Sequence, residues 1–174
     1  MTVTTHEIML KTETKSKAKI LGKRVKSYLV GQEFEVTVEL TNKGSAVFPG
    51  GSFTVSIEWP NGQTVRTSYQ ISMLNLGEVR KLPPFTTGAL SRGFATFTLE
   101  SSPANDGKPV NFHKPSGELI PSGPPGTVYS FYSILAKEPE EIYEFWGMII
   151  AAVSLAFLVG IELTRFLIWL STQA

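Results

Sequence analysis

A long apolar segment near the C-terminal end limits the possible folds of this chain more than any other part of the sequence. Residues 145–170 read FWGMIIAAVSLAFLVGIELTRFLIWL, and residues 145–161 contain no charge. A bilayer core about 30 Å thick needs about 20 mostly apolar residues in a helix that rises 1.5 Å per residue. Aromatic residues flank the segment as they do at membrane interfaces, with Tyr143 and Trp146 at one end and Trp169 at the other. These observations predict one membrane-spanning helix over residues 145–170, followed by a short tail, 171–174.

The alternative is a helix buried inside a larger globular protein. A helix that is apolar on every side needs many neighbouring elements to cover it. The roughly 135 residues that precede the segment are too few to enclose it and also fold around a core of their own. The membrane therefore explains the segment better, and the lipid bilayer is the first partner we expect.

Two patterns within this segment indicate contacts with another helix. Small residues recur every four positions at Ala152, Ala156 and Gly160, a spacing that lets a second helix approach closely. Glu162 and Arg165 are three residues apart and can pair on one face. These five residues are the candidate helix-packing residues, for self-association or for a protein partner. The alternatives are the ordinary abundance of small residues in such helices, and an Arg165 side chain that extends to the nearer interface.

The residues before the helix carry the pattern of β-strands. In residues 33–42, Phe34, Val36, Val38 and Leu40 alternate with Glu and Thr without a break. Alternation with period two is typical of a strand with one buried and one solvent-facing side. Residues 52–59 and 65–71 repeat the pattern, and the intervening Asn61-Gly62 step favours a tight turn.

Further strands are predicted around residues 19–25, 78–85, 93–99 and 128–135, which gives about seven in all. Such a series with regular turns is typical of an antiparallel sandwich. We therefore predict an all-β fold, an immunoglobulin-like antiparallel β-sandwich over residues 17–137 plus one C-terminal transmembrane α-helix. A small β-barrel is the alternative. Four glutamates and no base occupy residues 138–144, which we assign to an acidic linker.

Two motifs of the β-rich part resemble those of a known family. Residues 31–42, GQEFEVTVELTN, with the Lys43-Gly44 that follows, are similar to the G-x-x-x-x-V-x-V-x-x-x-N-x-G stretch of CARDB-type and related immunoglobulin-like modules. Leu74-Asn75-Leu76-Gly77-Glu78 resembles their L-x-x-G-E/Q step. The resemblance covers about residues 20–100, and the chain departs from the pattern after Glu100. It implies a seven-strand sandwich used for adhesion, spacing or assembly, as on archaeal and bacterial surface proteins, with no catalytic residues.

Residues 103–126 are rich in proline and glycine and predict a long loop with a small hairpin within it. The hairpin is expected because residues 110–113 and 118–120 flank Lys114-Pro115-Ser116-Gly117, a sequence suited to a type I turn. If the hairpin projects, its tip is a candidate contact surface; the alternative is a hairpin folded back onto the domain. The candidate tip residues are Phe112, His113, Leu119 and Ile120.

The first part of the chain is basic. Seven cationic residues and two glutamates, Glu7 and Glu13, lie within residues 1–26, and we assign residues 1–16 to a basic N-terminal arm. Lys15, Lys17 and Lys19 alternate, so they would line one face of an edge strand and block edge-to-edge aggregation. Contact with anionic lipid or with an acidic partner is the alternative.

Residues that carry chemistry are scarce. The chain has no cysteine, which excludes disulfides and thiolate sites, and its two histidines lie far apart in sequence without an acidic pair nearby. We find no metal-ligand cluster, nucleophile motif or phosphate-binding loop, and Asn105-Asp106-Gly107 reads as a turn rather than a calcium site. We therefore expect a protein that is not an enzyme, with no cofactor, and no nucleic-acid partner, because its bases are not interleaved with aromatic residues.

Two functions remain. The first is a single-pass, membrane-anchored interaction or adhesion module of the cell envelope; the second is an accessory subunit of an integral-membrane complex, assembled through the helix. Arg165 near the helix end and the resemblance to surface modules favour an outer location for the β domain. The opposite topology is the alternative, because residues 1–19 lack the apolar core of a signal peptide.

Overall fold

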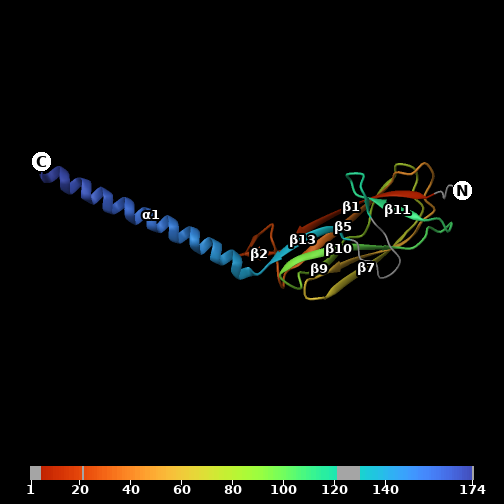
Figure 1. Cartoon of the computed structure of the whole chain (residues 1–174), viewed down its shortest axis with the longest axis horizontal. Coiled ribbons are helices and arrows are strands. Elements are labelled where there is room, and N and C mark those ends of the chain that lie inside the picture. Colours follow the sequence, from red (N-terminus) through yellow and green to blue (C-terminus); the bar gives the residue numbers. More distant parts are fainter. Residues whose placement is uncertain (1–4, 21, 121–129, 174) are drawn as a thin grey trace. The chain divides into compact units, whose positions relative to one another are not determined.

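The structure, a computed structural model, describes residues 5–20, 22–120 and 130–173. Two compact units divide the chain, residues 1–137 and residues 138–174, and each is described by itself. The first is built from strands and the second from one helix (Figure 1). In chain order the elements are β1 (His6–Ser16), β2 (Lys19–Ile20), β3 (Lys23–Arg24), β4 (Tyr28–Leu29), β5 (Glu33–Asn42), β6 (Gly51–Glu58), β7 (Thr64–Ile71), β8 (Val79–Lys81), β9 (Phe85–Gly88), β10 (Gly93–Ser101), β11 (Val110–His113), β12 (Leu119–Ile120), β13 (Ser130–Lys137) and α1 (Pro139–Gln173).

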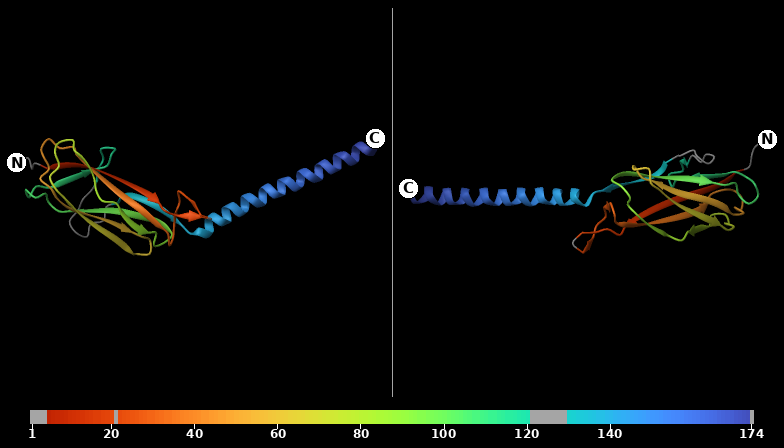
Figure 2. Two further views of the ribbon diagram at one scale, coloured as in Figure 1. Left: turned by 180° about the vertical axis from the view of Figure 1, so that it is seen from behind. Right: turned by 90° about the horizontal axis from the view of Figure 1, so that it is seen from below.

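The strands form two main sheets. The first has the order β12-β11-β1-β5-β8, and β9 also pairs with β5; the second has the order β4-β13-β10-β6-β7. All the pairings are antiparallel except β1 with β11 and β13 with β4. Strands β2 and β3 form a separate two-stranded ribbon at the end of the domain where β13 ends (Figure 2). The predicted β-rich fold is confirmed at this level.

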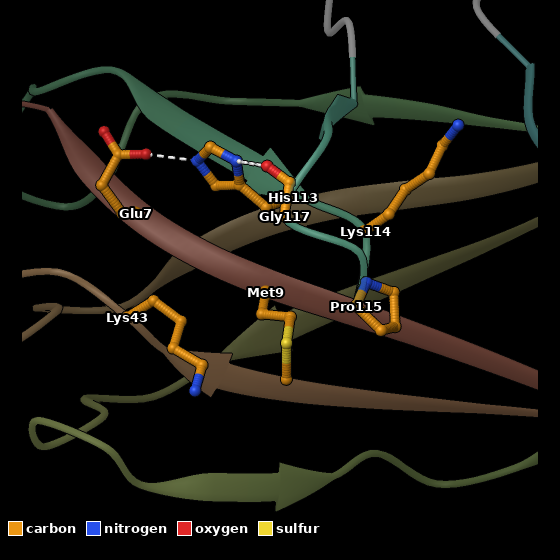
Figure 3. A pocket seen from close by; sticks show the side chains of 7 residues that line it. All are labelled: Glu7, Met9, Lys43, His113, Lys114, Pro115 and Gly117. Atoms are coloured by element: carbon orange, nitrogen blue, oxygen red, sulfur yellow. Dashed lines mark hydrogen bonds and ion pairs between the residues drawn. The ribbon is translucent and has the colours of Figure 1, made fainter.

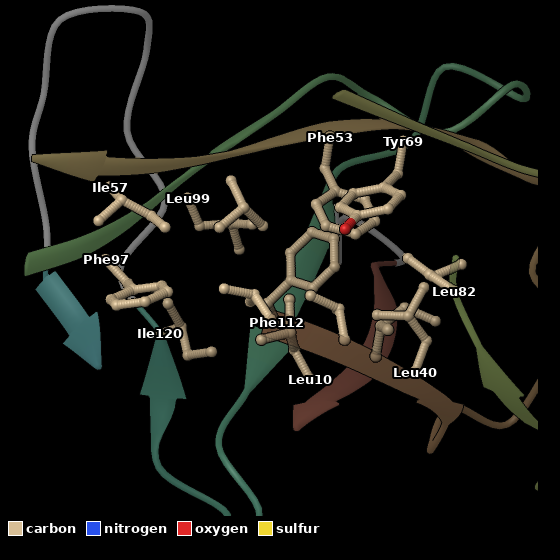
Figure 4. Close-up of a cluster of buried hydrophobic side chains, with 14 of the residues drawn as sticks. Leu10, Leu40, Phe53, Ile57, Tyr69, Leu82, Phe97, Leu99, Phe112 and Ile120 are labelled. Carbon is tan, nitrogen blue, oxygen red and sulfur yellow. The ribbon is translucent and has the colours of Figure 1, made fainter. Parts of the chain in front are cut away.

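The core lies between the two main sheets and follows from the alternation in their strands. Phe34, Val36, Val38 and Leu40 of β5 are all buried, as are Phe53, Val55 and Ile57 of β6. Side chains of both sheets meet in the core, where the ring centroids of Phe53 and Phe112 are 5.6 Å apart (Figure 4). The alternating residues of 33–42 and 52–59 are therefore the buried faces of two facing strands, as predicted.

Strand β1 shows that residues 6–16, which were assigned to an arm, belong to the first sheet; residues 1–4 of the expected arm lie outside the described residues. It pairs with β5 over nine residues, from Ile8 opposite Asn42 to Ser16 opposite Phe34, and with β11 over four. Only Ile8 and Leu10 among its inward residues are aliphatic. Farther along the strand, the inward Thr14 hydroxyl shares a hydrogen bond of 2.6 Å with the Tyr28 hydroxyl. A strand that buries so few aliphatic side chains shows only weak period-two alternation in its sequence. The lysines of this segment therefore led to the prediction of an arm.

The strand predicted at residues 19–25 is instead the short β2–β3 ribbon, whose turn contains Gly22 with a φ of 78°. The strand predicted at residues 78–85 is divided into β8 and β9, on either side of Pro83-Pro84. Both pair with β5, so the two prolines lie between two short strands and not within one. The last strand, predicted at 128–135, is β13; residues 128 and 129 lie outside the described residues.

The hairpin predicted within residues 103–126 is present as β11 and β12. Phe112 pairs with Ile120 and His113 with Leu119, and the Gly117 N–H donates to the Lys114 carbonyl at 2.8 Å to close the turn. Because β11 also pairs with β1, the hairpin is folded back as part of the first sheet and does not project. Residues 121–126 of the predicted loop lie outside the described residues.

Helix α1 begins earlier than predicted, so the expected linker 138–144 is helical from Pro139 onward. Proline suits the first helical position because its φ is already helical and its missing N–H has no partner there. Glu140 and Glu141 occupy the first turn, where acidic side chains complement the helix dipole. The helix continues through residues 171–173, which had been assigned to a tail.

Candidate functional site

The surface of α1 is apolar all around. No residue of its most hydrophobic window is buried, and Val153, Leu158 and Leu163, which project in three different directions around the helix, are each exposed. By length and composition α1 is able to cross a membrane, and it is the one helix of the described residues that meets this criterion. Such a surface in water would be strongly unfavourable, because apolar area is stabilised only when it is removed from water.

The aromatic residues of α1 lie at positions that suit a bilayer. Tyr143, Phe145 and Trp146 are exposed near one end, and Trp169 is exposed near the other. Trp146 and Trp169 are separated by about 34 Å of helix at 1.5 Å per residue. This distance equals the hydrocarbon core plus part of each interface, where Trp and Tyr are enriched.

The predicted helix-packing residues form a shallow hollow on one side of α1. Ala156, Gly160 and Thr164 line a hollow of about 490 Å³, and Ala152 lies exposed one turn before them. A Cβ placed on Gly160 would have open space around it, so α1 itself does not require glycine at this position. The Thr164 hydroxyl donates to the Gly160 carbonyl at 2.8 Å, which satisfies its polar hydrogen without a second chain. A second backbone has room to approach at this hollow.

Glu162 and Arg165 form an ion pair on α1. Arg165 Nη1 donates to Glu162 Oε1 at 2.8 Å, and the Arg165 and Glu162 side chains are 72% and 70% exposed respectively. Charged groups in a span are costly unless they are paired or reach the interface. The pair therefore reduces the cost of both charges in apolar surroundings while leaving them accessible to another helix.

Of the four residues predicted to form the hairpin tip, two face the core and two face outward. Phe112 and Ile120 are cross-strand partners and are buried in the core, with exposures of 2% and 0%. His113 and Leu119 alternate with them and point outward, and Leu119 is 50% exposed. The structure therefore leaves only the outward pair accessible to a partner, because side chains alternate along each strand.

His113 belongs to a cluster on the outer side of the first sheet (Figure 3). Its Nε2 lies 2.5 Å from Glu7 Oε2, and its Nδ1 lies 3.3 Å from the Gly117 carbonyl oxygen. The Glu7 carboxylate also accepts hydrogen bonds from Thr5 and Asn111. Partial burial raises the pKa of Glu7, but the hydrogen bonds from Thr5, His113 and Asn111 outweigh this effect and lower it.

A groove of about 480 Å³ adjoins this cluster. Apart from Glu7, His113 and Gly117, it is lined by Met9, Lys43, Lys114 and Pro115, so it combines apolar, cationic and hydrogen-bonding groups (Figure 3). Lys114 is paired with Glu118 at 2.9 Å. The groove is open to solvent and has the chemistry of a protein-contact surface.

His6 forms a second pair with a carboxylate, on the inner side of the same sheet. Its Nε2 lies 3.0 Å from Asp106 Oδ2, and its buried ring packs edge-on against Phe48 at 5.4 Å. Partial burial raises the pKa of Asp106, but hydrogen bonds from Lys108 and His6 outweigh it and hold the pKa at about 2. Asp106 lies in the turn predicted at residues 105–107, where the Gly107 N–H donates to the Ala104 carbonyl at 2.8 Å.

These two pairs correct the expectation that both histidines lack an acidic neighbour. Each partner lies about 100 positions away in sequence, and the parallel pairing of β1 with β11 brings His6 opposite Val110 and Glu7 opposite Asn111. No local pattern in the sequence points to this pairing. Among the described residues no group of three His, Cys, Asp or Glu side chains is arranged to hold a metal ion.

One exposed apolar pair on the β domain is not among the predicted contact residues. Phe94 of β10 and Leu135 of β13 are directly opposite each other, and they are 64% and 41% exposed. They lie on the outer side of the second sheet, because their strand neighbours Ala95 and Ile134 are buried.

Comparison of the chain with protein-family models and with curated proteins finds no match.

Proposed function

We propose that this chain is a single-pass membrane protein whose immunoglobulin-like β-sandwich serves interaction and not catalysis. The single observation that carries the proposal is the apolar surface of α1, whose most hydrophobic window has no buried residue. The alternation of β5 and β6 and the motif at residues 31–44 support the immunoglobulin-like assignment. The lipid bilayer is then the environment that the helix requires.

Extraction of membranes with alkaline carbonate tests the anchor. The full chain should remain in the membrane pellet, and a chain ending at Lys137 should be released into the supernatant. Release of both forms would contradict the proposal. Retention of both would assign membrane binding to the β domain.

The β domain is proposed to lie on the outer face of the membrane. Arg165 near the C-terminal end of α1 and the resemblance to surface modules support this topology. An alkaline phosphatase reporter fused before Met1 should be active, since the enzyme needs an oxidising compartment for its disulfides. An inactive phosphatase together with an active cytosolic reporter at the same position would reverse the topology.

Within this function, we favour assembly with a partner through α1, as an accessory subunit of a membrane complex. Two observations support it: the hollow at Ala156, Gly160 and Thr164, and the exposed Glu162–Arg165 ion pair.

A matched pair of substitutions tests the helix contact. Ala156→Ile fills the hollow and should reduce association in a membrane two-hybrid assay or co-purification in mild detergent, because small residues permit close helix approach. Ala151→Ile adds the same side chain to the opposite side of α1 and should leave association unchanged. Equal effects of the two substitutions would exclude the hollow as the contact.

An adhesion module is the second candidate, and the groove beside His113 with the exposed Leu119 favours it. Replacing residues 145–170 with an unrelated membrane helix separates the two candidates. Loss of a stoichiometric partner on this exchange supports the subunit. Retention of the partner, followed by its loss with Leu119→Asp, supports adhesion through the β domain.

A further inference from the structure

Several basic segments meet at one end of the β domain. Strand β1 ends there, where Ser16 pairs with Phe34, and the ribbon β2–β3 follows directly. Strand β13 ends at the same place, because Ala136 pairs with Tyr28 and the Val30 N–H donates to the Lys137 carbonyl at 3.0 Å. The chain leaves the β domain at this end, and α1 begins two residues after Lys137.

This end contains a hollow of about 390 Å³ that is lined mainly by cations. Its lining comprises Lys15, Ser16, Lys17, Lys19, Arg24 and Glu35. Four cationic side chains and one carboxylate give the hollow a net charge of +3, and all four cations are exposed. Lys17 lies 3.7 Å from Glu35, whereas Lys15, Lys19 and Arg24 have no carboxylate within 4.0 Å in the described part of the chain.

Backbone contacts hold the cations in place. The Ser16 hydroxyl donates to the Ser27 carbonyl at 2.7 Å, and the Lys19 N–H donates to the Gln32 side-chain oxygen at 2.8 Å. Ala18, between them, is buried and accepts a hydrogen bond from the Val25 N–H. The hollow is therefore formed by segments that are fixed to the sheet.

The ribbon places two like charges directly opposite each other. Lys19 and Arg24 are cross-strand partners, and like charges at such positions destabilise a strand pair. Protection of a strand edge accounts for single lysines along a strand, but not for four cations around one hollow. An anion bound between these side chains would remove their repulsion.

We propose that this hollow binds the anionic headgroup of a phospholipid in the membrane that α1 enters. The inference rests on the proposed function, since only an anchored chain keeps the hollow at a bilayer. The seven residues between Lys137 and Phe145 limit the distance from the domain to the span to about 25 Å when extended and about 12 Å when helical. The headgroup layer extends about 5–7 Å beyond the hydrocarbon core on each side of a bilayer. A helical connection therefore keeps the domain about 5–7 Å from the headgroups, within the Debye length of about 8–10 Å over which bases are attracted to an anionic leaflet.

Two other anions compete for the same cations. Glu138, Glu140, Glu141 and Glu144 follow the domain in sequence and have the opposite charge. Free phosphate has the same chemistry as the lipid headgroup. The bilayer is favoured because it presents many headgroups at a fixed short distance, which raises their effective concentration.

The test uses the full chain in nanodiscs and measures hydrogen exchange of the backbone amides in residues 17–28. In discs containing phosphatidylglycerol these amides should exchange at least about fivefold more slowly than in phosphatidylcholine discs, and added salt should reduce the difference. Changing Lys15, Lys17, Lys19 and Arg24 together to Gln should abolish the difference. The matched control changes Lys11, Lys43, Lys81 and Lys114 to Gln, which removes the same charge elsewhere and should preserve it.

Four outcomes would overturn the headgroup site. Equal exchange in both kinds of disc would exclude it, and so would equal effects of the two quadruple variants. Protection by inorganic phosphate in phosphatidylcholine discs would assign the hollow to a free anion. Protection in uncharged discs that disappears when the four glutamates of residues 138–144 become Gln would assign it to the chain's own acidic segment.

Separate control experiments test whether the variants fold and whether the chain enters the membrane. Removal of the Lys19–Arg24 repulsion should not destabilise the domain, and thermal unfolding of the variant checks this. A variant with Arg at the three lysine positions keeps the charge and should keep the protection. Failure of the chain to enter discs at all would refute the membrane anchor, whereas entry without lipid-dependent protection would refute only the headgroup site.

Discussion

The contribution of a single residue to the stability of the β domain depends on the side of the strand on which the residue lies. In the β11–β12 hairpin, Phe112 and Ile120 face the core, and their neighbours His113 and Leu119 face outward. The same alternation places His6 inside and Glu7 outside on β1, so each histidine–carboxylate pair lies on its own side of one sheet. These positions determine the effects of substitution.

Phe112→Ala should destabilise the domain by about 3–5 kcal/mol, because it removes a buried aromatic ring and leaves a cavity. Leu119→Ala is the matched control, because Leu119 lies on the outer side of the same hairpin and is half exposed; it should change stability by less than about 1 kcal/mol. Urea unfolding followed by tryptophan fluorescence measures both. Similar costs for the two would mean that the hairpin does not pack as described.

Asp106 predicts an effect of pH on stability. Its pKa is held at about 2 in the folded chain, below the ordinary 3.8, so its ionised form is bound more tightly in the folded state. A depressed folded pKa contributes stability that is complete above about pH 4 and is lost as the pH falls through about 2. Asp106→Asn should therefore be less stable than the parent near neutral pH and approach it near pH 2.

Unfolding midpoints in urea across this pH range test the contribution of Asp106. Glu33→Gln is the control, because the exposed Glu33 side chain makes no hydrogen bond or ion pair in the described structure. A parallel decline of the parent and the Asp106→Asn variant between pH 4 and pH 2 would contradict the role of the His6–Asp106 pair.

At the scale of elements, β1 is the main departure from the predicted organisation. It lies between β5 and β11 and contributes Ile8 and Leu10 to the core. Its two aliphatic residues and several charges gave a weak alternating signal, whereas the unbroken alternation of residues 33–42 predicted β5 correctly. A strand is recognised from its sequence only when its buried side is uniformly apolar.

Two neighbouring substitutions test the place of β1. Ile8→Gln puts a polar side chain into the core and should cost about 2–4 kcal/mol of the free energy of unfolding. Met9→Gln changes an outward residue and should cost less than about 1 kcal/mol. If residues 1–16 were a solvated arm, both substitutions would be nearly neutral in chemical denaturation.

At the scale of the whole molecule, the β domain and the helix are separate units. Residues 1–137 and 138–174 form two compact units, and the buried hydrophobic core lies within the first of them. The β domain therefore has its own core and does not need α1 for folding.

A chain ending at Lys137 should consequently unfold cooperatively, with a thermal midpoint within about 4 °C of that of the full chain in detergent. Near-ultraviolet circular dichroism and calorimetry measure this. A large fall in the midpoint or a loss of cooperativity would show that the helix supports the β domain.

Local periodicity in the sequence predicts three parts of this protein correctly. The apolar run of α1, the alternation of β5 and β6, and the turn between β11 and β12 are each written in a few consecutive residues. The tertiary structure alone decided which distant strands pair. The parallel pairing of β1 with β11 joins residues about 100 positions apart. Through this pairing the supposed arm becomes a strand and the hairpin becomes part of the sheet. It also brings each histidine next to a carboxylate. Pairing between distant strands depends on the packing of the whole core, which no short segment encodes.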